Sequence, residues 1–341
     1  MKIFPLTDSI LLPLAPTIVG TIAAYLQSIT QQIDIKPHSQ SCANEIGKLQ
    51  LDLSEQWQFQ RSIRQIPTSQ YQYVSTIAHQ LAAKSALTPL EICQQLHHSG
   101  SALTDPDSLP GALQDRSISL ELSAWYNQTS YIYVQFTPRS IEIWLNYIHD
   151  LPLDRLDLNL PSQSAGLDRL AVPTAAPITL ESIDLAIYAH ARCCALLKLA
   201  ATEKLATVTA NWQIITPNWS TAASSGANQP TAELDCIFDH VVEQRLIQTL
   251  MAVTAAIHGP NRPLITERLA SAPGQPPNWP RLTIDLAQSW LEFHRHCQIF
   301  GDLRRDNPRL AIARCQLTAI SRRYLQVLLE YYLDAVVLFE L

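Results

Sequence analysis

A proline-rich segment, residues 151–177, separates two parts of the chain that differ in pattern. It contains four prolines and a central glycine, Gly166, and shows little apolar periodicity. Proline removes a backbone donor and glycine loosens the chain, so this composition is typical of a linker. A chain of 341 residues can hold two domains that each bury a core. We therefore predict one domain at 1–150, a linker at 151–177 and a second domain at 178–341.

The pattern of the first part predicts a small α+β domain. Residues 118–122 and 131–136 are typical of strands, and the second run alternates between two faces. Apolar residues at helical spacing predict a helix over 69–84 and another from Thr137 to His149. A further helix is predicted to begin at Thr88-Pro89. Threonine is a common N-cap residue, proline suits the first helical turn, and Glu91 lies near the positive end of the helix.

The second part reads as a helical bundle, which makes the protein mainly α. We expect helices at 179–204, 231–257, 281–300 and 308–338, with a short one at 263–269. The last helix carries an apolar stripe at steps of three and four residues, formed by Leu310, Ala313, Leu317, Ile320, Tyr324, Val327 and Tyr331. Such a stripe is a buried face, so Arg314 and Arg322, which are displaced from it, are expected to face solvent or a partner.

Composition narrows the class of protein. Apolar residues make up 47% and charged residues 16%, as in a globular chain. Seven cysteines, an odd number with two adjacent, favour reduced thiols in the cytoplasm over a disulfide framework. We expect no membrane span, because no apolar run approaches the roughly 20 residues required. A net charge of −6 argues against a broad nucleic-acid surface.

Several motifs resemble those of arginyl-tRNA synthetases. The run Tyr188-Ala189-His190-Ala191-Arg192 is similar to the start of that family's DALR-type anticodon-binding domain. The stretches 293–301 and 309–329 resemble later segments of the same domain, in the same order. Residues 73–82 and 89–96 are similar to the family's appended N-terminal domain. The resemblance implies an appended α+β domain, a DALR-type helical bundle and tRNA as the partner.

The family's catalytic elements are missing from the sequence. No His-x-Gly-His turn occurs, no lysine follows Lys204, and the chain has nine glycines in all. Activation of arginine by ATP in that family uses such a turn and a lysine-rich loop, and 151–177 is far too short for the nucleotide-binding domain. We therefore expect no aminoacylation and no cofactor.

The candidate RNA-binding residues lie near the end of the chain. Between residues 295 and 323 there are two acids and seven arginines, namely Arg295, Arg304, Arg305, Arg309, Arg314, Arg322 and Arg323. Arginine offers planar, bidentate donors to phosphate. The alternative is a solvated surface on which these arginines pair with Asp302, Asp306 and Glu292. Trp290 and Phe293 are candidates for base stacking or for the core, whereas Tyr324 is expected in the core.

Other polar residues suggest no chemistry. His294 and Cys297 share a helical face, but zinc normally needs four ligands and no Cys-x-x-Cys pair is present, so we expect no metal. His190 and Arg192 are expected to pack and to form local hydrogen bonds.

Two hypotheses for the function remain. One is a non-catalytic synthetase-like protein that binds tRNA, and the other is a protein-interaction scaffold that kept the fold and lost RNA binding.

Overall fold

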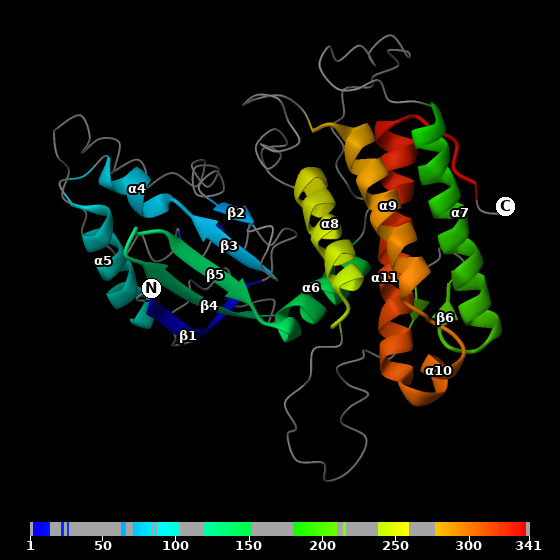
Figure 1. Ribbon diagram of the computed structural model, residues 1–341, viewed down its shortest axis with the longest axis horizontal. Coiled ribbons are helices and arrows are strands. Elements are labelled where there is room, and N and C mark those ends of the chain that lie inside the picture. The colour runs from blue at the N-terminus through cyan, green and yellow to red at the C-terminus, as the bar shows by residue number, and fades with distance from the viewer. Residues whose placement is uncertain are drawn as a thin grey trace. The chain divides into compact units, whose positions relative to one another are not determined.

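A computed structural model describes residues 3–13, 22–23, 26, 63–65, 71–83, 85, 87–102, 119–151, 180–209, 214–215, 238–258 and 277–338 (Figure 1). Contacts divide the chain into two compact units, Met1–Trp144 with Thr254–Ile265 and Leu145–Val253 with Thr266–Leu341. The described residues are mainly helical, as predicted, with a sheet in the first unit and a helical bundle in the second. Residues 152–177 of the predicted linker, and the predicted helix at 263–269, lie outside the described residues.

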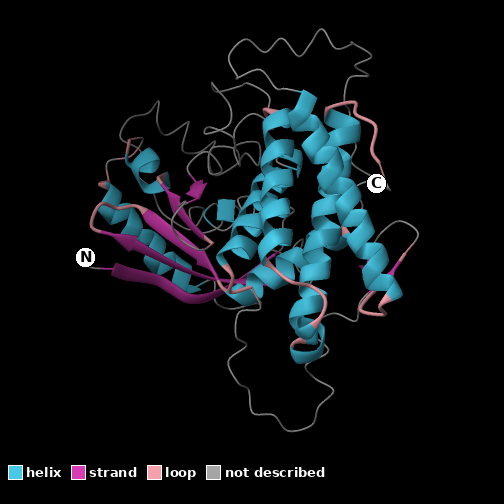
Figure 2. Cartoon of the chain, turned by 45° about the vertical axis from the view of Figure 1, so that its right-hand side comes forward, coloured by secondary structure: helices cyan, strands magenta, loops and turns pink. Residues whose placement is uncertain are grey.

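The first unit contains an antiparallel sheet (Figure 2). Its strand order is β1-β4-β5-β3-β2, formed by β1 (Ile3–Pro13), β2 (Ile63–Gln65), β3 (Gln72–Ser75), β4 (Ser119–Asn127) and β5 (Ile132–Phe136). The two predicted strands are confirmed as β4 and β5, and β4 extends beyond the predicted end at residue 122 to Asn127. A tight turn joins them, in which the Asn127 side-chain oxygen accepts hydrogen bonds from the backbone N–H groups of Thr129 and Tyr131.

Two helices, α4 (Ile77–Ala82) and α5 (Pro89–Ala102), pack against each other in this unit. The prediction of a helix over 69–84 is wrong in its first half, because Gln72–Ser75 is a strand that pairs with β5. Pairing of Val74 with Tyr133, far along the chain, outweighs a local spacing that fits a helix. The helix-start signal is confirmed at α5, where Thr88 N–H donates to Glu91 at 2.7 Å and Glu91 N–H donates to the Thr88 hydroxyl at 3.3 Å.

The second unit is built from long helices. They are α7 (Leu180–Thr202), α8 (Val241–His258), α9 (Trp279–His296) and α11 (Pro308–Val327), with the short α10 (Asp302–Asp306) before α11. A π-helical turn, η7 (Leu328–Tyr332), extends α11, and β6 (Thr207–Val208) pairs with β7 (Ile214–Ile215). Both α8 and α6 (Pro138–Asp150) have residues in each of the two units. The helices α7, α9 and α11 contact one another pairwise.

Most side chains of helix α11 are buried in the bundle. Leu317, Ile320 and Tyr324 are buried, as the apolar stripe predicts. Arg314 and Arg322 are buried as well, so the expectation that they face solvent is wrong. The prediction assumed that α11 packs against the protein along its apolar stripe alone and exposes the opposite face to solvent. Instead, α11 contacts both α7 and α9, so polar residues outside the stripe are buried too.

Tyr331 also departs from the predicted stripe, since its exposed fraction is 56%. The predicted helix over 308–338 stops being α-helical at Val327 and continues as a π turn. Because a π turn holds more residues than an α turn, it shifts the positions that follow out of register with the stripe.

One helix of the described residues is long and apolar enough to cross a membrane by length and composition alone. It is the Ile183–Thr202 part of α7, of which half is buried inside the bundle. A buried core helix meets the same criteria of length and composition.

Candidate nucleic-acid interface

The seven predicted arginines lie in different environments and do not form one surface. Arg314 and Arg322 are buried on α11, whereas Arg309 and Arg323 are half-buried on the same helix. Three others lie closer to solvent: Arg295 at the end of α9, and Arg304 and Arg305 on α10. Clustering in the sequence therefore overstates how much positive charge a ligand can reach.

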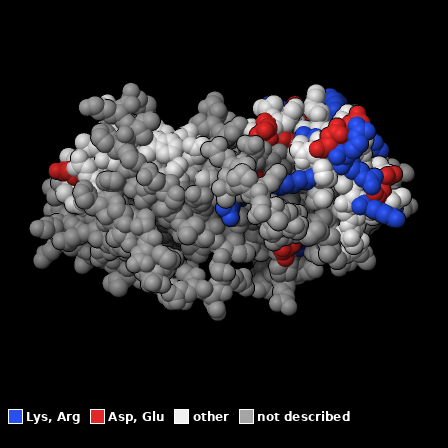
Figure 3. Space-filling model, turned by 90° about the horizontal axis from the view of Figure 1, so that it is seen from below, with Lys and Arg blue, Asp and Glu red and all other residues white. Residues whose placement is uncertain are grey.

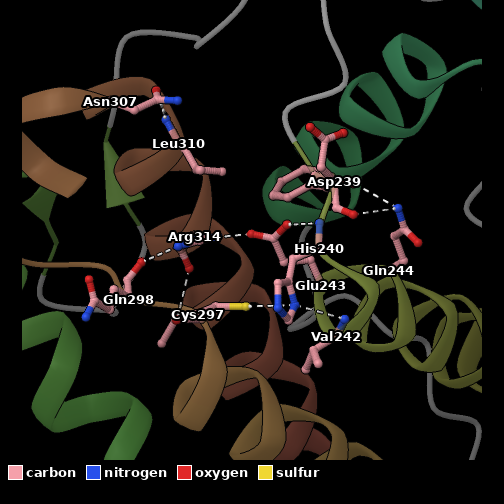
Figure 4. A network of polar contacts seen from close by, with 12 residues as sticks. Asp239, His240, Val242, Glu243, Gln244, Cys297, Gln298, Asn307, Leu310 and Arg314 are labelled. Atoms are coloured by element: carbon pink, nitrogen blue, oxygen red, sulfur yellow. Dashed lines mark hydrogen bonds and ion pairs between the residues drawn. The ribbon is translucent and has the colours of Figure 1, made fainter.

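Arg314 holds three elements of the bundle together (Figure 4). Its Nε donates to Glu243 Oε1 at 2.6 Å, and its Nη1 donates to the Gln298 carbonyl at 2.6 Å. The other oxygen of Glu243 accepts from the backbone N–H of His240 at 3.0 Å, at the start of α8. Glu243 is only 1% exposed, so this is a buried ion pair completed by hydrogen bonds. Arg314 is thus a structural residue, and an RNA phosphate has no access to it.

A cysteine and a histidine meet beside this pair. Cys297 Sγ lies 3.7 Å from His240 Nδ1, which also accepts the Val242 N–H at 3.2 Å. Burial, together with the charge of Glu243, raises the pKa of Cys297 to about 11 in spite of Arg314. A thiol with this pKa stays protonated at neutral pH and is a poor nucleophile. The pair therefore contributes packing and a weak hydrogen bond rather than covalent chemistry.

The guanidinium groups of Arg322 and Arg323 form hydrogen bonds within the second unit. Arg322 donates to the Gln326 side chain. Arg323 donates to the carbonyl of His149 at 2.7 Å and to that of Leu151. These bonds tie the middle of α11 to the end of α6 and occupy donors that phosphate binding would need.

The arginines of α10 lie among acids. Arg304 pairs with Glu203 at 2.7 Å, and Arg305 pairs with Asp302 at 2.9 Å and with Asp306 at 3.0 Å. Figure 3 shows the same mixture, with basic and acidic side chains interleaved. The sequence alternative of Arg–acid pairing is confirmed here for Asp302 and Asp306, whereas Glu292 pairs with Arg245 instead.

Two other arginines are exposed and form no ion pair with the described residues. Arg295 on α9 and Arg192 on α7 are exposed, and neither has an ion-pair partner in the described part of the chain. His294 precedes Arg295 on α9 and stacks on Trp290, and its pKa is lowered by burial and by the charge of Arg192. Tyr188, one helical turn before Arg192, is 45% exposed. We call Tyr188, Arg192 and Arg295 the α7–α9 surface.

Sequence reasoning missed Arg192, which was expected to pack locally. It placed His190 correctly: this residue is buried and its Nδ1 lies 2.9 Å from the Leu338 carbonyl. The signal for Arg192 was its spacing of four residues from Tyr188, with the buried His190 between them. That spacing puts Tyr188 and Arg192 on one side of the helix and His190 on the other.

The aromatic residues near the predicted site belong to the core. Trp290, Phe293 and Tyr324 are fully buried, which confirms the prediction for Tyr324 and removes the other two as base-stacking candidates. Cys193 and Cys194 are buried as well, and the described cysteines are free. His294 and Cys297 point to different partners, and the described residues contain no group of three or more potential metal ligands.

Comparison with known proteins identifies no relative. No protein-family model matches the chain, and neither the curated proteins nor the solved structures contain a significant match. The resemblance to arginyl-tRNA synthetases therefore remains a prediction from the motifs alone.

Proposed function

We propose that this chain is a non-catalytic arginyl-tRNA-synthetase-like protein that binds tRNA through the α7–α9 surface. The observation that carries the proposal is the pair of exposed arginines, Arg192 and Arg295, which have no acidic partner among the described residues. They belong to two of the sequence stretches that carry the resemblance, 188–192 and 293–301. Arg192 lies on α7 and Arg295 lies on α9, and these two helices contact each other.

The chemistry of the three side chains fits RNA. An exposed guanidinium without a partner can bind phosphate without first breaking an ion pair. Tyr188 offers an aromatic ring, on which an unpaired base can stack. Arg304 and Arg305 would have to leave their carboxylate partners, so we assign them a secondary role at the edge of the interface.

Binding without group transfer is part of the proposal. The sequence lacks the His-x-Gly-His turn and the lysine-rich loop of the resembled family. The histidine–cysteine pair of the bundle has a protonated thiol at neutral pH. Neither the motifs nor this pair supports a reaction, so the activity that we propose is recognition.

Capture of total cellular RNA tests the proposal. The purified full chain would be compared with Arg192→Glu/Arg295→Glu at low and at physiological salt, with sequencing of the retained RNA. Arg281→Glu is the matched control, because Arg281 is exposed on α9 but already pairs with Asp285. We expect the wild type and the control to retain one set of tRNAs at physiological salt, and the double variant to lose it. Equal retention by all three proteins would contradict the proposal.

A second candidate, a protein-interaction scaffold, is favoured by a separate observation. Tyr331, Val336 and Leu338 expose large apolar side chains close together in the sequence, after the end of α11. Exposed apolar groups of this kind are common in protein interfaces. This candidate predicts association with a protein that is insensitive to salt and is weakened by Val336→Ser. Retention of RNA that depends on Arg192 and Arg295 would favour the first candidate.

A further inference from the structure

Residues 333–338, which we call the C-terminal strap, fold back after the π turn. Leu333 N–H donates to the Leu328 carbonyl at 3.1 Å, and Ala335 N–H donates to the Leu329 carbonyl at 2.9 Å. Between them, Asp334 adopts a left-handed backbone conformation with a φ of 50°. Val337 is buried, whereas Val336 and Leu338 are exposed. A short segment with few buried side chains opens at low cost compared with the core.

The far end of the strap is held by a buried histidine. His190 Nδ1 lies 2.9 Å from the Leu338 carbonyl, 148 residues away in the sequence. A carbonyl oxygen only accepts, so Nδ1 carries the hydrogen of this bond. The His190 side chain is completely buried.

The groups around His190 disfavour its protonation. Arg322 of α11 acts on it with a positive charge, and Cys194 Sγ lies 4.0 Å from its Nδ1. Burial raises the pKa of Cys193 and Cys194, so both thiols are neutral. Burial lowers the pKa of Arg322, and the negative charge of Glu330 opposes that shift by favouring the charged form of the arginine. Burial first, and the Arg322 charge second, lower the pKa of His190 to about 4, with partial compensation from the Leu338 carbonyl.

We propose that the C-terminal strap is released by acid, because the enclosed site around His190 favours the neutral imidazole and protonation favours the open strap. In the closed state the cation would lie in an enclosed site beside Arg322. In the open state water reaches the imidazole, which then accepts a proton at its ordinary pKa of about 6.5. The open state therefore binds more protons than the closed state between pH 6.5 and pH 4, and acid shifts the equilibrium towards it.

The size of the effect follows from proton linkage. Below pH 6.5 the ratio of open to closed strap rises about tenfold per pH unit, until His190 is also protonated in the closed state. At pH 5 the ratio is about 30-fold higher than at pH 7.5. Above about pH 7.5 the ratio changes little, because the imidazole is neutral in both states.

Hydrogen exchange of the full chain tests this inference, with protection factors corrected for the intrinsic pH dependence of exchange. For the amides of Leu333 and Ala335 we expect protection to fall about 30-fold from pH 7.5 to pH 5. Amides in the middle of α9 report global unfolding and should keep their protection. His190→Asn keeps a donor near the position of Nδ1 without a titratable ring, so its strap should show no fall.

Two results would overturn the inference. One is wild-type protection at Leu333 and Ala335 that stays constant over this pH range, which decides the matter even if His190→Asn does not fold. The other is an equal fall in α9, which would mean that acid unfolds the bundle as a whole.

Discussion

Arg314 and Arg192 are the same kind of residue on neighbouring parts of one bundle, yet their surroundings give them opposite roles. Arg314 lies inside, where Glu243 and the Gln298 carbonyl take up its donors at 2.6 Å. Arg192 lies outside on α7 with no ion-pair partner in the described part of the chain. A guanidinium that is buried and hydrogen-bonded to two elements holds them together, and one that is exposed and has no ion-pair partner can bind a ligand. The environment of each arginine, rather than its position in an arginine-rich segment, assigns its role.

We expect the largest loss of stability on substitution of Arg314. Arg314→Met leaves the Glu243 carboxylate buried without its cation, which should lower the free energy of unfolding by about 3 to 5 kcal/mol. Urea denaturation followed by circular dichroism measures the loss. The double variant Glu243→Leu/Arg314→Met removes both charges and should recover most of it. A single-variant loss below about 1 kcal/mol would show that the pair is not the tie that we describe.

A smaller effect is expected at Arg323, which is half-buried and donates to two backbone carbonyls. Arg323→Ala leaves the carbonyls of His149 and Leu151 without this donor, at a cost of about 1 to 3 kcal/mol. Arg323→Lys keeps a cation that can reach one of them and should lie between the alanine variant and the wild type. If the alanine variant is as stable as the wild type, Arg323 contributes no more to stability than an exposed arginine does.

The smallest effect is expected at Arg305, which is 74% exposed and pairs with Asp302 and Asp306. Solvent screens such pairs, so Arg305→Ala should change the free energy of unfolding by no more than about 0.5 kcal/mol. The same urea titration applies. A loss above about 1.5 kcal/mol would mean that α10 is held in place by these ion pairs, and the division between interior and surface arginines would need revision.

Local patterns predicted much of the fold because the elements concerned carry local signals. The Thr88–Glu91 pair marks the start of α5, and alternation marks β5. The predictions of secondary structure and burial are wrong where contacts between residues far apart in the sequence determine the structure. Gln72–Ser75 becomes a strand because β5 pairs with it, and Tyr331 turns outward because α11 ends in a π turn.

The candidate site could be predicted only in part for the same reason. Arg295 was found from the sequence, but the pairing of Arg304 with Glu203 joins residues 101 positions apart and has no local signal. Arg314 and Glu243 are 71 positions apart. Spacing within α7 contained the signal for Arg192, yet its exposure depends on which side of α7 the other helices cover. Helical periodicity alone does not contain that information.

The most direct test of the central claim is the salt dependence of tRNA binding. Titrations of the wild type and of Arg192→Glu/Arg295→Glu over a range of salt concentrations give the slope of log K against log salt. Each phosphate contact contributes about 0.7 to 0.9 to that slope, so the loss of two contacts should weaken binding and flatten the slope by about 1.4 to 1.8. The control Arg281→Glu should keep the wild-type slope. A double variant with the wild-type affinity and slope would contradict the assignment of RNA binding to the α7–α9 surface.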